Sequence, residues 1–422
     1  MKVCGIIAEY NPFHSGHAYH ISAARRESGC DYIVAVMSGD FVQRGAPALI
    51  DKYIRAQQAL LGGADLVLML PVCTSTASAE GFARAGIAAL MTTGIVDSVS
   101  FGCEDTSVCS GHYQNLAQKL AWESDSFQAA LLEKLSSGKS YASARSDVIQ
   151  SFEAGSIDTS LLRKPNNLLA FEYLRAMERS GYHMDIYPVK RVGSYHNETL
   201  PKAASEDFPV FASASACRRT LLSKSREKLW QLASAGQIPP VVCRLLADYA
   251  NQYDYLEEDD FSRMMHYALL LYQTKGYRQF YDCGGDLSAR IAGKLPDYES
   301  FTQFCDVLKN KSVTRTRIAR VLTHILLGLP AQMPAPLLKN YRLPYLRVLG
   351  LKKSAAPLLH ELKMRSAAPL ITRPARAKRK LTPDALDYFA QDLFAADIYR
   401  SALFHKCGKC YASDYRRTIK TI

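Results

Sequence analysis

Two histidines three residues apart are the feature of this sequence best suited to chemistry. His14 and His17 close the segment Glu9-Tyr-Asn-Pro-Phe-His-Ser-Gly-His17, which follows an apolar run at 3–8 and precedes a helical pattern at 18–27. A strand-to-helix turn offers unpaired backbone N–H groups and the positive end of the helix dipole. Imidazoles at such a turn suit an anionic phosphate chain, so the segment predicts a nucleotide site.

A structural role for these histidines is the alternative, because an HxGH tetrad occurs in many chains by chance. What favours the nucleotide site is position. The tetrad follows the first predicted strand, where α/β nucleotide folds place their phosphate loop.

The surrounding elements predict an α/β, Rossmann-like fold with a parallel sheet. Short apolar or β-branched runs predict strands at 3–8, 32–37, 65–70, 96–101 and 184–189. Helical patterns lie between or after them at 18–27, 51–61, 78–91, 167–177 and from about Ser213. This alternation is typical of βαβ units with right-handed crossovers.

Pro239-Pro240 marks a predicted boundary, because strand signals fade beyond about residue 237. Helical periodicity then dominates at 241–249, 260–272, 298–309 and 312–327. We therefore expect a nucleotide-binding domain over residues 1–236 and a mainly helical region over residues 237–422.

Composition indicates ordinary globular protein, with 48% hydrophobic and 22% charged residues in 422. No stretch approaches the roughly 20 apolar residues of a membrane span, and the first apolar run is too short for a signal peptide. We expect a cytoplasmic protein. The 11 cysteines are scattered and odd in number, which indicates reduced thiols.

One CxxC pair, Cys407 and Cys410, follows His405 and precedes Asp414. Structural zinc needs four ligands, and no second CxxC is present. We therefore favour a turn carrying two thiols and predict no metal site.

The positive charge is concentrated near the C-terminal end. Residues 331–422 hold 18 Lys and Arg against 6 acidic residues, an excess of 12 that equals the net charge of the whole chain. The densest cluster and the tyrosines of the same region are Arg373, Arg376, Lys378, Arg379 and Lys380, with Tyr341, Tyr345, Tyr388, Tyr399, Tyr411 and Tyr415. Cations for phosphates and rings for stacking predict a polynucleotide surface; a solvated basic loop is the alternative.

Small or polar groups follow the predicted strands where each one ends, at the edge where open α/β sheets bind ligands. They are the run 38–45, Gly102, Asn166 and Asn167, Arg191, Ser213, Ser215 and Arg218. Each has a structural alternative, such as a strand end for Gly102 or a helix cap for Ser213. Their repeated placement at the edge of His14 and His17 favours a shared ligand site.

These motifs resemble the HIGH-type nucleotidyltransferases and, more narrowly, the bacterial tRNA(Met) cytidine acetate ligases. The likeness rests on the segments 9–17, 37–45, 164–169, 190–191, 213–218 and 345–350, and spans nearly the whole chain. Two departures, Asp40 in place of Asn or His and Cys217 in place of Ile, leave the charged and hydroxyl groups in place.

The resemblance implies that ATP and acetate form acetyl-adenylate and that the acetyl group passes to N4 of the wobble cytidine, position 34, of elongator tRNA(Met). It implies His14, His17 and Arg218 as catalytic residues and Mg²⁺ bridging the phosphates. It places ATP along Ile7, Ala8, Glu9, Tyr10, Asn11, Pro12, Phe13, His14, Ser15, Gly16, His17, Ala18, Tyr19 and His20, with Gly102, Asn166 or Asn167, Arg191, Ser213 and Ser215. It also implies a tRNA-binding role for the basic cluster of Arg373, Arg376, Lys378, Arg379 and Lys380.

The chemistry agrees with the residues, because acetate is already an anion and the motif shows no clear pair of nucleophile and base. Two other classes of function stay open. One is a small-molecule adenylyltransferase, which shares the tetrad but seldom carries a basic helical region. The other is a non-catalytic RNA-binding protein, which we expect to have lost one of His14, His17 or Arg218.

Overall fold

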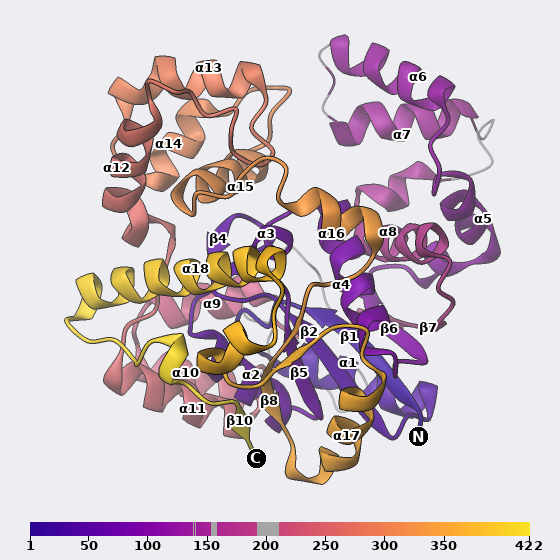
Figure 1. Cartoon of the computed structure of the whole chain (residues 1–422), viewed down its shortest axis with the longest axis vertical. Coiled ribbons are helices and arrows are strands. Elements are labelled where there is room, and N and C mark those ends of the chain that lie inside the picture. The colour runs from indigo at the N-terminus through magenta and orange to yellow at the C-terminus, as the bar shows by residue number, and fades with distance from the viewer. Residues whose placement is uncertain (138, 140, 153–157, 192–210) are drawn as a thin grey trace.

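The computed structural model describes residues 1–137, 139, 141–152, 158–191 and 211–422. Its centre is a mostly parallel sheet in the order β10-β8-β5-β2-β1-β6-β7, with β9 paired to β8 (Figure 1). The strands are β1 Val3–Ala8, β2 Tyr32–Met37, β5 Leu66–Met69, β6 Ser98–Cys103, β7 Asp185–Lys190, β8 Leu346–Leu351, β9 Leu370–Ile371 and β10 Lys420–Thr421. The predicted α/β class with a parallel sheet is confirmed.

Helices cover both faces of the sheet, which is why its central strands are apolar along their length. Val3 and Ile7 of β1 pack with α4 (Ala79–Thr93) and α8 (Pro165–Ser180). Cys4 and Ile6 pack on the other face with α1 (Ser15–Ser28) and α2 (Lys52–Leu61). Helices α9 Ala214–Leu222, α10 Arg226–Ser234 and α11 Pro240–Gln252 join this second core.

Two groups of helices stand above the sheet in Figure 1. One comprises α5 Gly111–Lys119, α6 Asp125–Ser136 and α7 Tyr141–Phe152. The other, which we call the helical lobe, comprises α12 Ser262–Tyr272, α13 Gly285–Lys294, α14 Phe301–Leu308 and α15 Arg315–Leu326, and has its own apolar core. The remaining helices are α3 Val72–Ser75, α16 Pro334–Asn340, α17 Ala356–Arg365 and α18 Pro383–Cys407, and α18 crosses between the lobe and the sheet.

A short hairpin connects the sheet to the helical lobe. Strands β3 (Phe41–Val42) and β4 (Ala46–Pro47) pair antiparallel directly after β2. Gly45 has φ +71°, and a Cβ there would lie 2.2 Å from the backbone nitrogen of Arg320 in α15. Only glycine fits this contact, so the hairpin turn is fixed against the lobe.

The predicted strands and the helices of the first 190 residues are present, with ends shifted by a few residues. Strands β8, β9 and β10 lie beyond residue 237 and were not predicted. Strand β8 pairs antiparallel with β5, so the later region completes the sheet of the first. The domain boundary itself stays a prediction. Among the described residues, no helix is both long and apolar enough to cross a membrane.

Candidate active site

His14 is the N-cap of α1, at the end of the loop that leaves β1. Its ring stacks on that of His17, with 3.8 Å between the ring centroids. The backbone N–H of His14 donates to Nδ1 of His17 at 3.2 Å. Because Nδ1 of His17 accepts, the proton of the neutral ring lies on Nε2, which makes that nitrogen a donor.

Gly16 allows the two rings to stack. A Cβ at this position would lie 2.9 Å from Cε1 and 3.0 Å from Nδ1 of His14, and 3.5 Å from Cβ of Phe211. The glycine of the HxGH tetrad is therefore required by close approach of a side chain, not by its backbone conformation.

Three imidazoles of α1 are held neutral. Burial, then the charges of Arg191 and Arg218, lower the pKa of His14 to about 3. Burial lowers the pKa of His17 well below its ordinary value, and burial with Arg191 lowers that of His20 to about 4. Nε2 of His20 lies 3.0 Å from Oγ of Ser100 in β6. Neutral rings under the influence of arginine charges form a site that attracts an anion and supplies N–H donors.

Arg218 of α9 reaches back to the tetrad loop. Its Nη1 donates to the carbonyl oxygen of Asn11 at 2.8 Å, and its Nη2 donates to Oγ of Ser215 at 2.9 Å. Ser213 is the N-cap of α9, where its Oγ accepts from the N–H of Ala216 at 3.1 Å. The structure thus brings Arg218 to the histidines, and gives Ser213 the capping role that was its structural alternative.

Arg191 and Gly102 lie together at the ends of β7 and β6. The N–H of Arg191 donates to the carbonyl oxygen of Cys103 at 2.8 Å. A Cβ at Gly102 would lie 3.6 Å from Cγ of Arg191. Gly102 therefore leaves room for the Arg191 side chain beside the histidines.

Asn166 and Asn167 begin α8 and bind the end of β6. Oδ1 of the buried Asn167 accepts from the N–H groups of Glu104 and Asp105, at 2.8 and 3.1 Å. Glu104 in turn accepts from Nδ2 of Asn166 at 2.6 Å and from the N–H of Asn167 at 2.9 Å. Nδ2 of Asn167 is buried without a partner. The two asparagines fix the β6 edge beside Gly102.

The rest of the predicted ATP segment divides between core and loop. Ile7, Tyr10 and Phe13 are buried in the two cores, and Phe13 packs directly on Gly62. Tyr10 has φ +49° and its ring meets that of His17 edge-on. Oδ1 of Asn11 accepts from the N–H of Leu49 at 2.8 Å. These side chains shape the loop that carries the histidines.

Two buried residues that hold this site together were not predicted. The Arg55 guanidinium donates to the carbonyl oxygens of Ile50, Glu9 and Ser38 at 3.1, 2.7 and 3.2 Å, and to that of Gly39. The Gln237 carbonyl accepts from the N–H of Ser15 at 2.9 Å, and its Oε1 accepts from that of Ala212 at 2.5 Å. No local sequence signal identifies them, because each acts through backbone atoms of distant segments.

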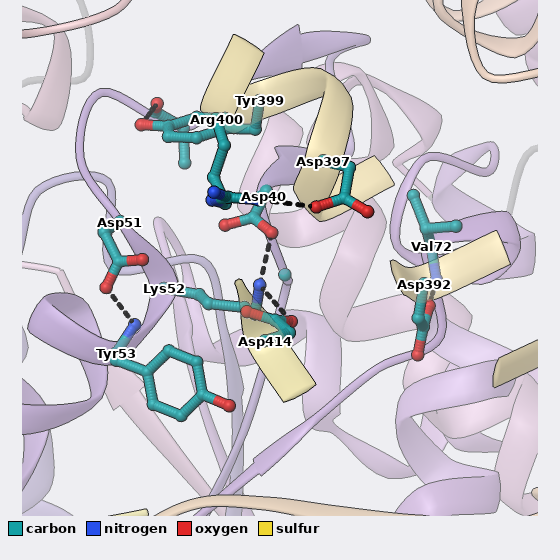
Figure 2. A network of polar contacts seen from close by, with 12 residues as sticks. Asp40, Asp51, Lys52, Tyr53, Val72, Asp392, Asp397, Tyr399, Arg400 and Asp414 are labelled. Carbon is teal, nitrogen blue, oxygen red and sulfur yellow. Dashed lines mark hydrogen bonds and ion pairs between the residues drawn. The ribbon is translucent and has the colours of Figure 1, made fainter. Parts of the chain in front are cut away.

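Beneath the loop that follows β2 lies a buried network of charges, shown in Figure 2. Nζ of Lys52 lies 2.5 Å from Oδ2 of Asp40 and 2.8 Å from Oδ2 of Asp414. Asp414 also meets Nη2 of Arg347 in β8 at 2.5 Å. Burial raises the pKa of Asp40; burial opposes ionisation of Asp414 too, but Lys52 and Arg347 lower its pKa below the usual range. The network joins Asp40, in the loop after β2, to Arg347 of β8 and to Asp414, a few residues before β10.

The predicted tRNA-binding cations lie on η6 (Pro374–Arg379) and its flanks. Arg373, Arg376, Lys378, Arg379 and Lys380 are exposed, and Nζ of Lys380 donates to the carbonyl oxygen of Leu370 at 3.0 Å. Three of the six tyrosines of this region are unsuited to stacking on bases. Tyr341, Tyr345 and Tyr399 are buried in the apolar cores, whereas Tyr415 is exposed.

Within the described ranges, no group of three or more His, Cys, Asp or Glu side chains could hold a metal ion. Sγ of Cys407 points to the carbonyl oxygen of Leu403 at 3.2 Å, and Nη2 of Arg400 lies 3.8 Å from Sγ of Cys410. The CxxC pair is thus engaged with its own helix end.

Comparison with known proteins agrees with the nucleotide-binding geometry. The model of the HIGH nucleotidyl transferase family matches residues 1–414. Proteins named tRNA(Met) cytidine acetate ligase from a Thermoanaerobacter species, Clostridium kluyveri and Bacillus subtilis are 34%, 35% and 32% identical. The matches cover 95%, 94% and 88% of this chain and 96%, 94% and 87% of those proteins.

Two solved structures extend the comparison to three dimensions. The crystal structure of Thermotoga maritima TmcAL bound with alpha-thio ATP has a TM-score of 0.87 at 26% identity, and covers 100% of both chains. The apo form has a TM-score of 0.89, also at 26% identity and 100% coverage. The whole chain, including the late strands of the sheet, shares that fold.

Proposed function

This chain belongs to the HIGH nucleotidyltransferase family and, within it, to the tRNA(Met) cytidine acetate ligases, and from that membership we propose how its site carries out the ligation. ATP and acetate form acetyl-adenylate, and the acetyl group then passes to N4 of the wobble cytidine, position 34, of elongator tRNA(Met). The relative from Thermotoga maritima was crystallised with an ATP analogue, which supports ATP as the nucleotide. A cytoplasmic location accords with a tRNA substrate.

The observation that carries this proposal is the ring stack of His14 and His17 at the start of α1, beside the loop that Arg218 binds. The charges of Arg191 and Arg218 both act on His14. In the first step a carboxylate oxygen of acetate bonds to the α-phosphorus, and the bond to the pyrophosphate oxygen breaks. Acetate is an anion at neutral pH and needs no base. Residues that donate to the phosphates, as Nε2 of His17 can, stabilise the charge that develops there.

Arg191 and Arg218 supply the fixed positive charge. Burial lowers the pKa of each, yet an arginine stays protonated in proteins. Mg²⁺ would be held by phosphate oxygens and water rather than by a carboxylate cluster, since the described residues show none at this site. When bound with ATP it neutralises phosphate charge.

In the second step N4 of the cytidine attacks the acetyl carbonyl carbon, and AMP leaves with the electron pair of the mixed anhydride bond. N4 releases one proton to solvent as the amide forms. The nucleotide must be unstacked to reach the site. We propose that the exposed cations on η6 and its flanks bind the phosphates of the anticodon arm.

Incubation with ATP, labelled acetate and total bacterial tRNA, followed by nucleoside analysis, tests the proposal. We expect label in N4-acetylcytidine of elongator tRNA(Met). Pyrophosphate release that needs neither acetate nor tRNA would instead indicate a small-molecule adenylyltransferase. RNA binding without label in any nucleoside would indicate a non-catalytic RNA-binding protein.

A further inference from the structure

The turn of the β3–β4 hairpin stands between the candidate active site and the helical lobe. On one side, the N–H of Gln43 donates to Oε1 of Glu9, in the loop that carries the histidines, at 2.9 Å. On the other side, Oγ1 of Thr323 in α15 donates to the carbonyl oxygen of Gly45 at 2.8 Å. Arg44 is the residue between these two anchors, so both parts of the protein fix its position.

The base of the hairpin is also fixed. The N–H of Ala48 donates to the carbonyl oxygen of Asp40 at 2.8 Å, and Oγ of Ser75 donates to that of Phe41 at 3.1 Å. The Asp40 side chain enters the buried network through Lys52 (Figure 2). A loop held at its base, at its turn and through a buried charge is a rigid support for a side chain at its tip.

Arg44 is exposed and lies near Arg218. Burial lowers the pKa of Arg218, and the charge of Glu9 raises it. The charge of Arg44 is the next largest influence and lowers the pKa of Arg218. Arg218 itself is bonded to the Asn11 carbonyl oxygen beside His14. A phosphate at this edge would meet two guanidinium groups, while the nearby Glu9 carboxylate already accepts from the N–H of Gln43.

We propose that Arg44 binds a backbone phosphate next to the target cytidine, and so seats the acceptor strand at the mouth of the nucleotide site. This inference rests on the proposed function. An unstacked cytidine brings its own 5′ and 3′ phosphates to the edge of the site, and a guanidinium can bind a phosphate through two parallel hydrogen bonds.

The placement favours an RNA phosphate over the phosphates of ATP. The donors for the triphosphate, His14, His17 and Arg191, gather around the start of α1 and the ends of β6 and β7. Arg44 lies instead at the turn of the β3–β4 hairpin, which Thr323 of α15 holds against the helical lobe. The arginine charges that act on His14 are those of Arg191 and Arg218, whereas Arg44 acts on Arg218. We therefore assign the phosphate at Arg44 to the RNA.

Variants Arg44→Ala and Arg44→Lys test the proposal in two separate assays. The first is acetate-dependent exchange of label between pyrophosphate and ATP; the second is acetyl transfer to tRNA(Met) at several salt concentrations. For Arg44→Ala we expect the rate of pyrophosphate–ATP exchange to stay unchanged. The kcat/KM for tRNA in acetyl transfer should fall about 10-fold, because one pair of charged hydrogen bonds is lost. The slope of log kcat/KM for tRNA against log salt concentration should shrink by about 0.7. For both quantities Arg44→Lys should lie between the wild type and Arg44→Ala.

Arg26→Ala is the matched control. Arg26 lies in the last turn of α1, away from the histidines, with a side chain 64% exposed, and we expect it to leave both assays unchanged. Unfolding midpoints equal to that of the wild type show that each variant is folded.

Equal loss of exchange and transfer in Arg44→Ala would assign Arg44 to ATP and overturn the proposal, and so would no loss in either assay. Lack of acetate-dependent exchange by the wild-type protein would instead refute the proposed function. In that case the tRNA affinity, measured directly, still tests whether Arg44 binds RNA. Equal affinity for Arg44→Ala and the wild type overturns the assignment of Arg44.

Discussion

Gly16→Ala should impair adenylation by displacing the two stacked histidines. The added Cβ would lie 2.9 Å from Cε1 of His14, where an ordinary contact needs at least about 3.4 Å. His14 cannot yield freely, because it is 6% exposed and its ring is stacked on His17 at 3.8 Å. We therefore expect the two rings to move by about half an ångström, a displacement that catalytic groups tolerate poorly.

The expected cost is about 10²-fold in kcat/KM for the adenylation step, or about 2.7 kcal/mol in its activation free energy. Folding should be weakened as well. The strain of an overpacked site, about 1–3 kcal/mol, exceeds the about 0.4–1 kcal/mol that alanine gains over glycine through the unfolded chain, so the free energy of unfolding should fall by about 1–2 kcal/mol. His17→Ala, which removes a donor outright, should lose about 10²–10³-fold.

Acetate-dependent ATP–pyrophosphate exchange measures the adenylation step, and urea unfolding measures stability. Gly293→Ala is the matched control, since Gly293 is an exposed position of α13 with no atom within 4 Å of an added Cβ. It should be at least as stable as the wild type and equally active. Wild-type exchange by Gly16→Ala would refute the role given to the stacked histidines.

Three further predictions follow from other parts of the molecule. Replacing Arg376, Lys378, Arg379 and Lys380 by glutamine should weaken tRNA binding and flatten its salt dependence while pyrophosphate exchange is kept; unchanged affinity would place the tRNA elsewhere. Asp414→Asn should lower the free energy of unfolding by roughly 3–5 kcal/mol in urea titrations, because Lys52 and Arg347 stay buried and each loses a charged partner. The control Asp397→Asn changes a carboxylate that is 57% exposed, so it should lower the free energy of unfolding by less than about 1 kcal/mol. Burial lowers the pKa of His324 to about 4 from an ordinary 6.5, so between these values the unfolded chain binds more protons. The contribution of His324 to stability should therefore be full above pH 6.5 and be lost as the pH drops toward 4. In urea titrations across this range, the free energy of unfolding should change less steeply with pH in His324→Gln than in the wild type. An equal slope in the two proteins would contradict this assignment.

Much of the nucleotide site could be predicted because its parts carry local signals. The HxGH tetrad begins α1 and Arg218 reaches the tetrad loop, as expected from polar residues at strand ends, whereas Ser213 caps α9, which was its structural alternative. Arg55 and Gln237 could not be predicted, since both bind backbone atoms of segments far away in sequence. Their side-chain types alone indicate surface positions.

Strand β8 was missed for a related reason. Its run Leu346–Leu351 is short and contains Arg347, a residue that argues against a buried strand until Asp414 is brought beside it. Three of the six tyrosines, Tyr341, Tyr345 and Tyr399, were misjudged because a phenol ring serves equally in a core and in base stacking. Tyr345 and Tyr399 are fully buried.

The buried network also sets an order of events during synthesis. Lys52 and Asp40 leave the ribosome early, but the second carboxylate of Lys52 belongs to Asp414, more than 300 residues later. Strands β8 and β10 likewise join a sheet whose first strands are made at the start. A nascent chain therefore holds its phosphate loop on an incomplete sheet until Asp414 and β10 have been made, so activation of acetate should begin only after these segments are in place.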